Sequence, residues 1–293
     1  MRRLLIVGCG DVVRRALPQL LRHWRVFALV RRRDEQLAEL GVLQIVGDLD
    51  RRATLHRIAG IADAVIHSAP PPSAGADDPR TARLLATLAT GKSVPRSLVY
   101  IGTSGIYGDC GGAQVDETRP PAPRTDRARR RQAAETRLRA FGRSSGCRVA
   151  LLRAPGIYAA ERLPLERVRQ RLPLLRAEED SFTNHIHAED LARALDAALR
   201  RGRPNRTYNV VDDSVLKMGD WFDRLADAFG LPRAPRLPPA DVRTQLSPLQ
   251  LSFMGESRRL DNRRMKRELG LRLRYPSVIE GLAAARAETE RTA

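Results

Sequence analysis

The sequence predicts an α/β protein built on a parallel, doubly wound sheet with helices on both faces. Over the first two-thirds of the 293 residues, short apolar segments alternate with longer amphipathic ones, which is the pattern of successive βαβ units. The early apolar segments are apolar throughout, as expected for strands that are covered on both faces. A glycine turn directly follows the first of them and separates a strand from a helix.

Seven apolar segments are predicted to form the strands of this sheet. They are short, and a predicted helix lies between each strand and the next. The predicted strands are 3–8, 25–30, 42–48, 63–69, 97–102, 147–153 and 207–211.

Six amphipathic segments are predicted helices. Pro18 lies inside the first and should kink it, because proline lacks the N–H that continues the hydrogen-bond ladder. Two other segments, 70–79 and 108–126, are rich in Pro and Gly and are predicted loops. The predicted helices are 12–23, 33–41, 51–60, 78–90, 126–145 and 188–201.

The chain is expected to divide into a sheet domain and a smaller lobe. The alternation of strands and helices fades after residue 212, and the stretch 230–242 is proline-rich. We therefore expect a sheet domain made of residues 1–153 plus 184–211. The smaller C-terminal lobe would consist of residues 154–183 plus 212–293.

The composition argues against several classes of protein. The formal charge is +18, but the positive residues are almost all arginines spread along the chain, and aromatic residues make up only 4%. Without a basic patch or a stacking platform, we do not expect nucleic acid to be the main partner. No apolar stretch is long enough to cross a membrane, and the N-terminal one is too short for a secretion signal. Three distant cysteines suggest a cytoplasmic protein without a metal site.

The glycine turn has the pattern of a dinucleotide-binding loop. In VGCGDVV, Gly8 and Gly10 occupy the first two fingerprint positions, where a missing Cβ lets main-chain amides approach a pyrophosphate. The third position holds Val13 instead of glycine, which predicts a shifted helix or a looser site. A glycine turn without a ligand is the alternative interpretation.

Arginines follow the second predicted strand. Arg31 and Arg32 stand about 20 residues after the glycines, where an acid contacts the ribose of NAD and an arginine accommodates the 2′-phosphate of NADP. We therefore expect NADP(H) as the preferred cofactor and NAD(H) as the alternative, although a solvated basic turn would explain the same residues. Asp48, at the end of the third strand, is placed to accept a hydrogen bond from the adenine amino group.

Six motifs together resemble one family. VGCGD, VGDLD, VIHSAPP, YIGTSGIYGD, LLRAPGIY and NHIHAEDLARA have the order and spacing of extended short-chain dehydrogenases/reductases. The chain resembles their NAD-dependent epimerase/dehydratase branch, specifically its atypical members. The resemblance implies a Rossmann-type domain, a substrate-binding C-terminal lobe and a small polar, sugar-like substrate. The expected cofactor contacts are Gly8, Cys9, Gly10, Asp11, Val12, Arg31, Arg32, Asp48, Leu49, Ser68, Ala69, Pro70, Thr103, Arg131, Pro155 and Gly156.

The resemblance also implies a catalytic hydroxyl. The family has a Ser or Thr four residues before the tyrosine of a Val/Ile-Tyr-Gly triplet, and here Tyr107 of that triplet places Thr103 at the hydroxyl position. Such a hydroxyl binds the substrate oxygen whose carbon exchanges hydride with the nicotinamide. Ser104 is a neighbour that could share this role, and Tyr107 is a candidate proton donor. The alternative is that these hydroxyls only cap the loop.

The second half of the family's catalytic pair is altered. The family places a Tyr-x-x-x-Lys on the next helix, and the matching positions here are Arg127 and Arg131. Arg131 keeps the charge that holds the ribose, but Arg127 cannot pass a proton near neutral pH. The family's proton relay is therefore absent, and Ser104-Gly105 replaces the Asp-Glu pair of sugar-nucleotide dehydratases, which argues against dehydration.

Two functions remain open at this point. A reductase or epimerase is favoured by Thr103, and a catalytically silent NADP(H) sensor is favoured by the missing tyrosine. His185 and His187 alternate as on a strand and are expected to be structural rather than zinc ligands. The oligomeric state also stays open, with a homodimer as the arrangement that related folds often use. Four arginines are candidates either for an anionic-substrate clamp or for surface charge: Arg153, Arg162, Arg167 and Arg258.

Overall fold

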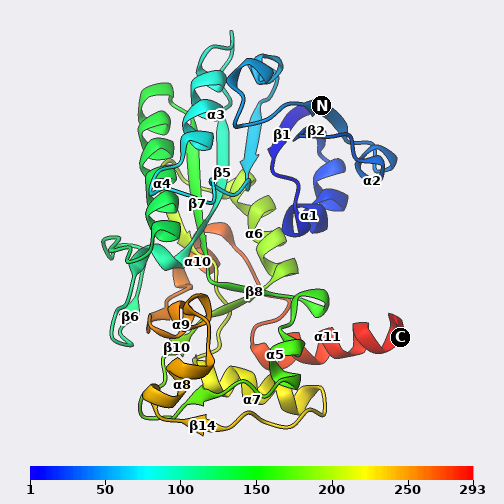
Figure 1. The fold of residues 1–293 in the computed structure, drawn as a ribbon. Helices are drawn as coiled ribbons and strands as arrows, with labels where there is room; N and C mark the ends of the chain where they lie inside the picture. The colour runs from blue at the N-terminus through cyan, green and yellow to red at the C-terminus, as the bar shows by residue number, and fades with distance from the viewer. Residues whose placement is uncertain (293) are drawn as a thin grey trace.

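The structure, a computed structural model, describes residues 1–292, without the side chains of residues 249, 253 and 292. Its centre is a seven-stranded sheet in the order β12-β7-β5-β4-β1-β2-β3, and all neighbouring pairs are parallel (Figure 1). Strand order reverses between β1 and β4, as in the predicted doubly wound sheet, and every predicted strand is present. The strands are β1 (Arg2–Val7), β2 (Trp24–Val30), β3 (Leu43–Val46), β4 (Ala64–His67), β5 (Ser97–Thr103), β7 (Arg148–Ala154) and β12 (Arg206–Asn209).

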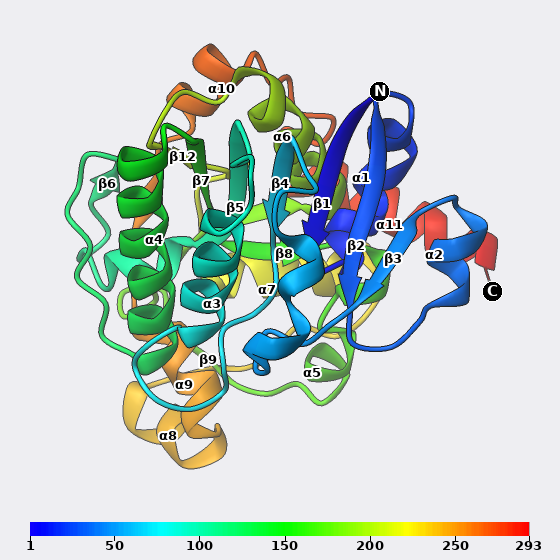
Figure 2. The ribbon, with the colours of Figure 1, turned by 90° about the horizontal axis from the view of Figure 1, so that it is seen from above.

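Helices cover both faces of the sheet. Figure 2 shows α3 (Pro79–Ala89) and α4 (Asp126–Ser145) on one face, and α1 (Asp11–Leu21) and α6 (Ala188–Arg201) on the other. The short α2 (Glu35–Glu39) lies beside the edge strand β3. Pro18 is on the exposed side of α1, and the helix continues through it to Leu21.

The predicted helix 51–60 is wrong. Two 3₁₀ turns, Arg52–Thr54 and His56–Ile58, take its place. Leu55 and Ile58 are both fully buried and are three residues apart, which is the period of a 3₁₀ turn. The Thr54 hydroxyl also donates to the Arg51 carbonyl at 2.7 Å and draws the backbone into a turn.

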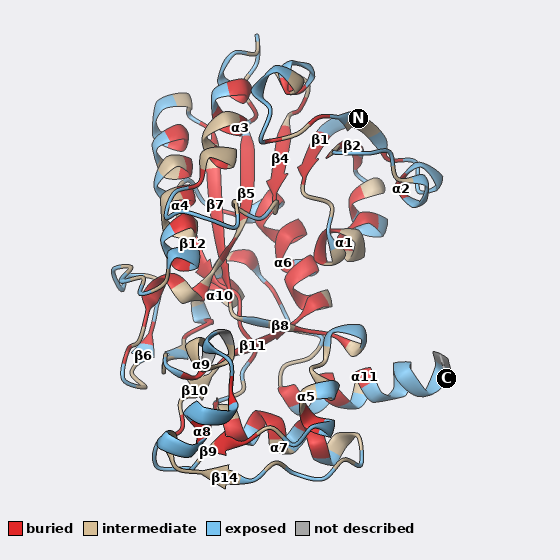
Figure 3. Ribbon diagram, viewed as in Figure 1, coloured by how far each residue is buried: buried red, intermediate tan, exposed pale blue. Residues whose placement is uncertain are grey.

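The strands are apolar throughout because two hydrophobic clusters enclose the sheet. Leu4 and Ile6 of β1 belong to the cluster on the α1/α6 face, whereas Leu5 and Val7 belong to the cluster on the α3/α4 face. All four side chains are buried, and Figure 3 shows the central strands as buried along their length. Burial of both faces explains why no polar/apolar alternation is seen in the sequence.

A smaller lobe covers the carboxyl ends of the strands (Figure 1). Its core includes Trp221, Phe222 and Leu225 of α7, which pack against Tyr158 and Leu282. Its elements are β8 (Gly156–Tyr158), α5 (Leu165–Arg169), β9 (Leu174–Leu175), β10 (Phe182–Thr183), β11 (His185–His187), β13 (Leu216–Lys217), α7 (Met218–Ala228), β14 (Arg236–Leu237), α8 (Pro239–Gln245), α9 (Pro248–Met254) and α11 (Val278–Thr292).

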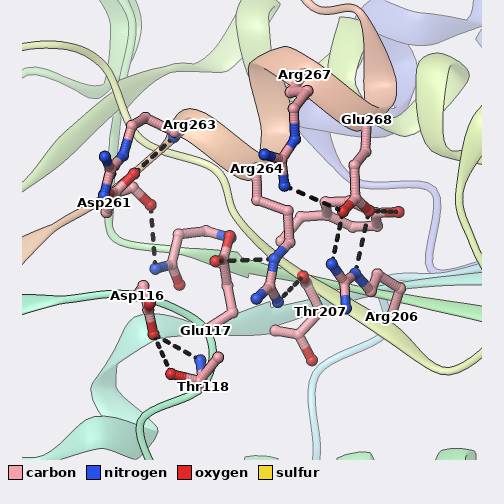
Figure 4. Close-up of polar contacts among 12 residues, drawn as sticks. Asp116, Glu117, Thr118, Arg206, Thr207, Asp261, Arg263, Arg264, Arg267 and Glu268 are labelled. Carbon is pink, nitrogen blue, oxygen red and sulfur yellow. Dashed lines mark hydrogen bonds and ion pairs between the residues drawn. The ribbon is translucent and has the colours of Figure 1, made fainter.

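The chain returns to the sheet domain before α11. β15 (Arg259–Leu260) pairs with β6 (Gln114–Val115), and α10 (Arg263–Leu269) packs against α6 and β12. Figure 4 shows the polar contacts that hold this return: Glu268 forms a bidentate ion pair with Arg206, and Glu117 pairs with Arg264. The Glu117–Arg264 pair and the β6–β15 pairing hold the loop 108–126 against the returning segment. No helix within residues 1–292 has the length and apolar character that crossing a membrane requires.

Candidate cofactor and substrate site

The glycine turn after β1 has a geometry that only glycine tolerates. Gly8 has φ +92°, and a Cβ atom added there would lie 2.3 Å from the main-chain nitrogen of Ala69. The Ser68 hydroxyl donates to the Gly8 carbonyl and ties the end of β4 to the turn. Strands β1 and β4 therefore approach each other closely at the point where the strand order reverses.

The N-terminus of α1 opens onto free space. Gly10 is its N-cap, no side chain caps the helix, and a Cβ atom added to Gly10 would meet nothing within 4 Å. The exposed main-chain amides and the positive end of the helix dipole favour an anion at this place. Val13, which replaces the third fingerprint glycine, is buried in the core against the sheet. Its side chain fills the helix–strand contact and does not enter the open space.

A cavity of about 940 Å³ lies beside this turn. Arg31 and Arg32 line it, and their guanidinium groups make no hydrogen bond or ion pair with another described residue. Three further arginines that the sequence analysis missed also line it: Arg14, Arg51 and Arg80. Arg14 lies one turn into α1 and pairs with Asp34 across the cavity wall. Arg14 could have been predicted from the sequence, because it stands four residues after Gly10, on the first turn of the predicted helix.

Most of the expected adenosine-side contacts line this first cavity. Three do not: Asp11 pairs with Arg15 and Arg162, Val12 is buried, and Ser68 is held by the Gly8 carbonyl. Burial raises the pKa of the Cys9 thiol to about 11, so this cysteine is protonated and unreactive at neutral pH. The expected contacts that do line the cavity are Gly8, Cys9, Gly10, Arg31, Arg32, Asp48, Leu49, Ala69 and Pro70.

A second cavity, of about 640 Å³, adjoins the first at Pro70. The sheet domain contributes Thr103, Ser104 and Arg131, and Pro155 and Gly156 follow β7. The smaller lobe contributes the opposite wall from β10, β11, α5, α7 and α9. The residues expected at the reacting end therefore come together, with the exception of Tyr107.

Thr103, the last residue of β5, and Arg131 of α4 line the same cavity. The Thr103 hydroxyl oxygen accepts from the Gly105 N–H at 3.1 Å, and its own proton has no acceptor among the described residues. The Arg131 guanidinium donates to the Tyr100 hydroxyl at 3.1 Å and to the Ile101 carbonyl at 3.3 Å. Burial raises the pKa of Tyr100 to about 12, against the opposing effect of Arg131, so Tyr100 remains protonated. The Thr103 hydroxyl thus caps the loop and is still able to donate.

Tyr107 lies outside the second cavity, contrary to its candidacy as proton donor. Its buried hydroxyl donates to the Asn209 side chain at 2.8 Å, and its ring lies 4.6 Å from the Arg153 guanidinium carbon. Arg153 in turn forms a buried bidentate ion pair with Glu135, at 3.1 and 2.7 Å. The ring therefore packs against a structural ion pair. Tyr158 is also buried, and it packs on Trp221.

The candidate anion-binding arginines separate into two groups. Arg153 and Arg162 are paired with Glu135 and Asp11, respectively, whereas Arg167 and Arg258 line the second cavity. His187 caps α6 by accepting from the Glu189 N–H, as its expected structural role implies. Within residues 1–292 there is no group of three or more His, Cys, Asp or Glu side chains placed to hold a metal ion.

Sequence comparison identifies the family of the chain. Residues 5–211 match the model of the NAD dependent epimerase/dehydratase family. The chain belongs to this family. A dTDP-D-glucose 4,6-dehydratase of Bos taurus is 23% identical over 131 residues, 41% of this chain and 37% of that protein. A trifunctional UDP-glucose 4,6-dehydratase, 3,5-epimerase and reductase of Arabidopsis thaliana is 21% identical over 150 residues, 46% of this chain. These matches span less than half of the curated relatives.

Several solved structures share the fold of this chain over nearly its whole length. A functionally unknown conserved protein from Silicibacter pomeroyi DSS is 30% identical, with a TM-score of 0.82 over 99% of this chain and 100% of that one. UDP-glucose 4-epimerase from Thermotoga maritima, solved with UDP-glucose, has a TM-score of 0.80 at 18% identity over 99% of both chains. A Streptomyces venezuelae dTDP-glucose 4,6-dehydratase variant, solved with NAD, has 0.77 at 22% identity over 98% of this chain and 97% of that one.

Proposed function

We propose that this protein is an NADP(H)-dependent oxidoreductase or epimerase that acts on a small polar substrate. One observation carries the proposal: two cavities meet at Pro70 beside the glycine turn, where the strand order reverses. Open α/β sheets bind their ligands at such a switch point. A dinucleotide extended across Pro70 would have its adenosine half in the first cavity and its nicotinamide half in the second. The NAD found in the S. venezuelae structure supports this class of cofactor.

The charges of the first cavity support the phosphorylated cofactor. Arg31, Arg32 and Arg51 have exposed, unpaired guanidinium groups there, whereas the acids that line it are Asp34 and Asp48. Asp34 accepts from the Leu37 N–H and pairs with Arg14, and these two contacts lower the pKa of its carboxyl. A phosphate monoester on the adenosine ribose would find guanidinium partners, and guanidinium groups bind phosphate in bidentate geometry.

The second cavity supports carbonyl–alcohol chemistry. When bound, the nicotinamide supplies or accepts the hydride at the substrate carbon. Thr103 would donate a hydrogen bond to the oxygen on that carbon, since its proton has no other acceptor. The nearby Arg131 guanidinium would stabilise negative charge that develops on the same oxygen. Arginine keeps its proton near neutral pH, so the proton would come from solvent water.

A second candidate function is a catalytically silent NADP(H) sensor. One observation favours it: Arg127 lines the second cavity where family members place the proton-relay tyrosine, and both Tyr107 and Tyr158 are buried outside that cavity. A sensor would keep the cofactor contacts and need no proton donor. The enzyme and the sensor therefore differ only in turnover.

Binding and turnover measured together separate the two functions. NADPH and NADH are titrated by fluorescence, and turnover is then measured on panels of aldehydes, ketones and sugar nucleotides. For the enzyme we expect turnover that Thr103→Val lowers at least tenfold and Thr103→Ser largely restores. Tight cofactor binding with no turnover on any panel would support the sensor. Turnover that Thr103→Val leaves unchanged would overturn the role of the hydroxyl.

A further inference from the structure

His185 is a buried histidine in the wall of the second cavity, and its ring has no hydrogen-bond partner. It is the first residue of β11 and is 6% exposed, and its Nδ1 is buried and unpartnered. The two other buried histidines differ. Nε2 of His67 lies 2.8 Å from the Thr81 hydroxyl, and Nδ1 of His187 accepts from the Glu189 N–H at 3.3 Å. Of the buried histidines in the described chain, His185 alone has neither ring nitrogen bonded.

The ring of His185 is held with its Nε2 edge uncovered. It stacks on Trp221, with ring centres 4.1 Å apart and an angle of 27° between the planes, and it meets the Tyr158 ring edge-on at 6.2 Å. Gly156 lies beside it in the β8–β11 pairing, and a Cβ atom added to Gly156 would be 3.1 Å from Cδ2 and 3.6 Å from Nε2 of the ring. Gly156 also lines the cavity, so its missing side chain leaves this edge of the imidazole open.

The ring is a neutral hydrogen-bonding group rather than a cation. Burial lowers the pKa of His185 from 6.5 to about 3, and no carboxylate lies near enough to oppose the shift. Phe182, Met218 and Phe222 add apolar surface to the same cavity. An unpartnered polar atom in such surroundings lowers stability unless a ligand supplies its hydrogen bond. The partner that fits a neutral imidazole there is an uncharged polar group.

His185 and Thr103 flank the same short segment of main chain. Thr103 lies beside Ala154 at the end of β7, and His185 lies beside Gly156, two residues further along. Pro155 and Gly156 of this segment are the residues expected to lie against the nicotinamide. A flat ring can approach main chain that carries no side chain. The nicotinamide carries one uncharged amide, and an amide offers both a donor and an acceptor.

We infer that Nε2 of His185 forms a hydrogen bond with the carboxamide of the nicotinamide and so fixes the orientation of the nicotinamide ring in the second cavity. This inference rests on the proposed function, because it requires a pyridine dinucleotide across the two cavities. A ring held by its carboxamide cannot turn over, so it presents one face to the substrate. His185 is then a positioning residue that the smaller lobe contributes to the cofactor site.

The test compares His185→Phe with His23→Phe. Phenylalanine keeps a flat ring for the stack on Trp221 and removes both nitrogens, whereas His23 is exposed and lines neither cavity. Calorimetry measures binding of NADP⁺ and of adenosine 2′,5′-bisphosphate, which lacks the nicotinamide half. We expect His185→Phe to weaken NADP⁺ binding about five- to tenfold, as the loss of one hydrogen bond implies, and to leave bisphosphate binding within about twofold. His23→Phe should leave both affinities within about twofold of the wild type.

Nitrogen NMR of the chain labelled with ¹⁵N-histidine gives a second readout. NADP⁺ should shift the Nε2 resonance of His185, which is assigned by its loss in His185→Phe, and adenosine 2′,5′-bisphosphate should not. If His185→Phe does not fold, Gly156→Ala takes its place, because its Cβ covers the same edge of the ring and should likewise weaken binding of NADP⁺ alone.

Two results would overturn the inference while the proposed function stands. The first is an equal affinity for NADP⁺ in the wild type and His185→Phe, with no shift of the Nε2 resonance. The second is an equal loss for NADP⁺ and the bisphosphate, which would show that His185 acts only through the fold. A wild-type chain that binds neither nucleotide would instead defeat the proposed function, and this inference with it.

Discussion

Gly8 and Ala69 lie so close together that a Cβ atom on Gly8 would be 2.3 Å from the Ala69 main-chain nitrogen. This contact brings together the ends of β1 and β4, directly below the turn that leads into α1. Gly10, two residues later, has no such neighbour. The two glycines therefore differ in their surroundings: the fold requires a glycine at position 8, whereas Gly10 borders open space, where the proposed dinucleotide would lie.

Alanine substitutions should separate these two reasons. Gly10→Ala should lower the free energy of unfolding by no more than about 1 kcal/mol, because its Cβ meets no atom and the only loss is that alanine is a poorer N-cap than glycine. It should weaken NADPH binding at least tenfold, since the new Cβ occupies the space of the diphosphate. Gly8→Ala should lower stability as well, through both the clash and the positive φ. Urea unfolding and fluorescence titration measure these effects; unchanged NADPH affinity in Gly10→Ala would place the dinucleotide elsewhere.

Cofactor preference should depend on Arg31. Arg31→Gln should weaken NADPH binding about 10- to 100-fold and leave NADH binding within about threefold, because only NADPH carries the 2′-phosphate. Arg33→Gln is the matched control, since Arg33 is also exposed but does not line the cavity. Parallel titrations of both nucleotides measure the ratio. If Arg31→Gln lowered the affinities for NADPH and NADH equally, Arg31 would not contact the 2′-phosphate.

The buried pair of Glu135 and Arg153 should be strongly coupled. Glu135→Gln alone leaves the Arg153 charge buried without its partner and should lower the free energy of unfolding by about 3–5 kcal/mol. The double variant Glu135→Leu, Arg153→Met should come within about 2 kcal/mol of the wild type, because both desolvated charges are gone. A double-mutant cycle by urea unfolding measures the coupling. Additive losses would show that the two residues act separately.

Asp212 should make stability depend on pH. The residue is 3% exposed, and burial raises the pKa of its carboxyl from 3.8 to about 7, although the hydrogen bond from the Ser214 N–H opposes the shift. The folded state then binds this proton more tightly than the unfolded state does. The resulting stability is fully present below about pH 4 and is lost as the pH rises to about 7.

Asp212→Asn should remove this dependence, because the amide oxygen still accepts from the Ser214 N–H and carries no charge. The variant should gain roughly 2–4 kcal/mol relative to the wild type between pH 4 and pH 8. The difference between the two unfolding free energies isolates this residue from all other titrating groups. A constant difference over that range would show that Asp212 keeps an ordinary pKa in the fold.

The strands could be predicted because burial on both faces leaves a simple mark in the sequence. Leu4, Leu5, Ile6 and Val7 are apolar in succession since each faces one of two cores. The prediction of a helix at 51–60 was wrong because the pattern of buried residues there is ambiguous. Buried residues three apart, Leu55 and Ile58, fit a helix and a 3₁₀ turn equally well, and side-chain bonds to the backbone decided between them.

Residues of the candidate site could be predicted where their position follows from the end of a strand. They could not be predicted where their role depends on a side-chain partner that is distant in sequence. Thr103 and Gly10 are fixed by the ends of β5 and β1, so motif spacing located them. Tyr107 follows β5 just as directly, but its hydroxyl is bound by Asn209, which is distant in sequence. Sequence spacing also could not show that Arg153 has a carboxylate partner and that Arg167 lacks one.

Calorimetric titration of the wild-type chain with NADPH and with NADH tests most directly whether the glycine turn and its arginines bind a pyridine dinucleotide. The proposed function predicts saturable binding of NADPH at one site per chain, with at least tenfold weaker binding of NADH and strong dependence on Gly10. No heat from either nucleotide would contradict it.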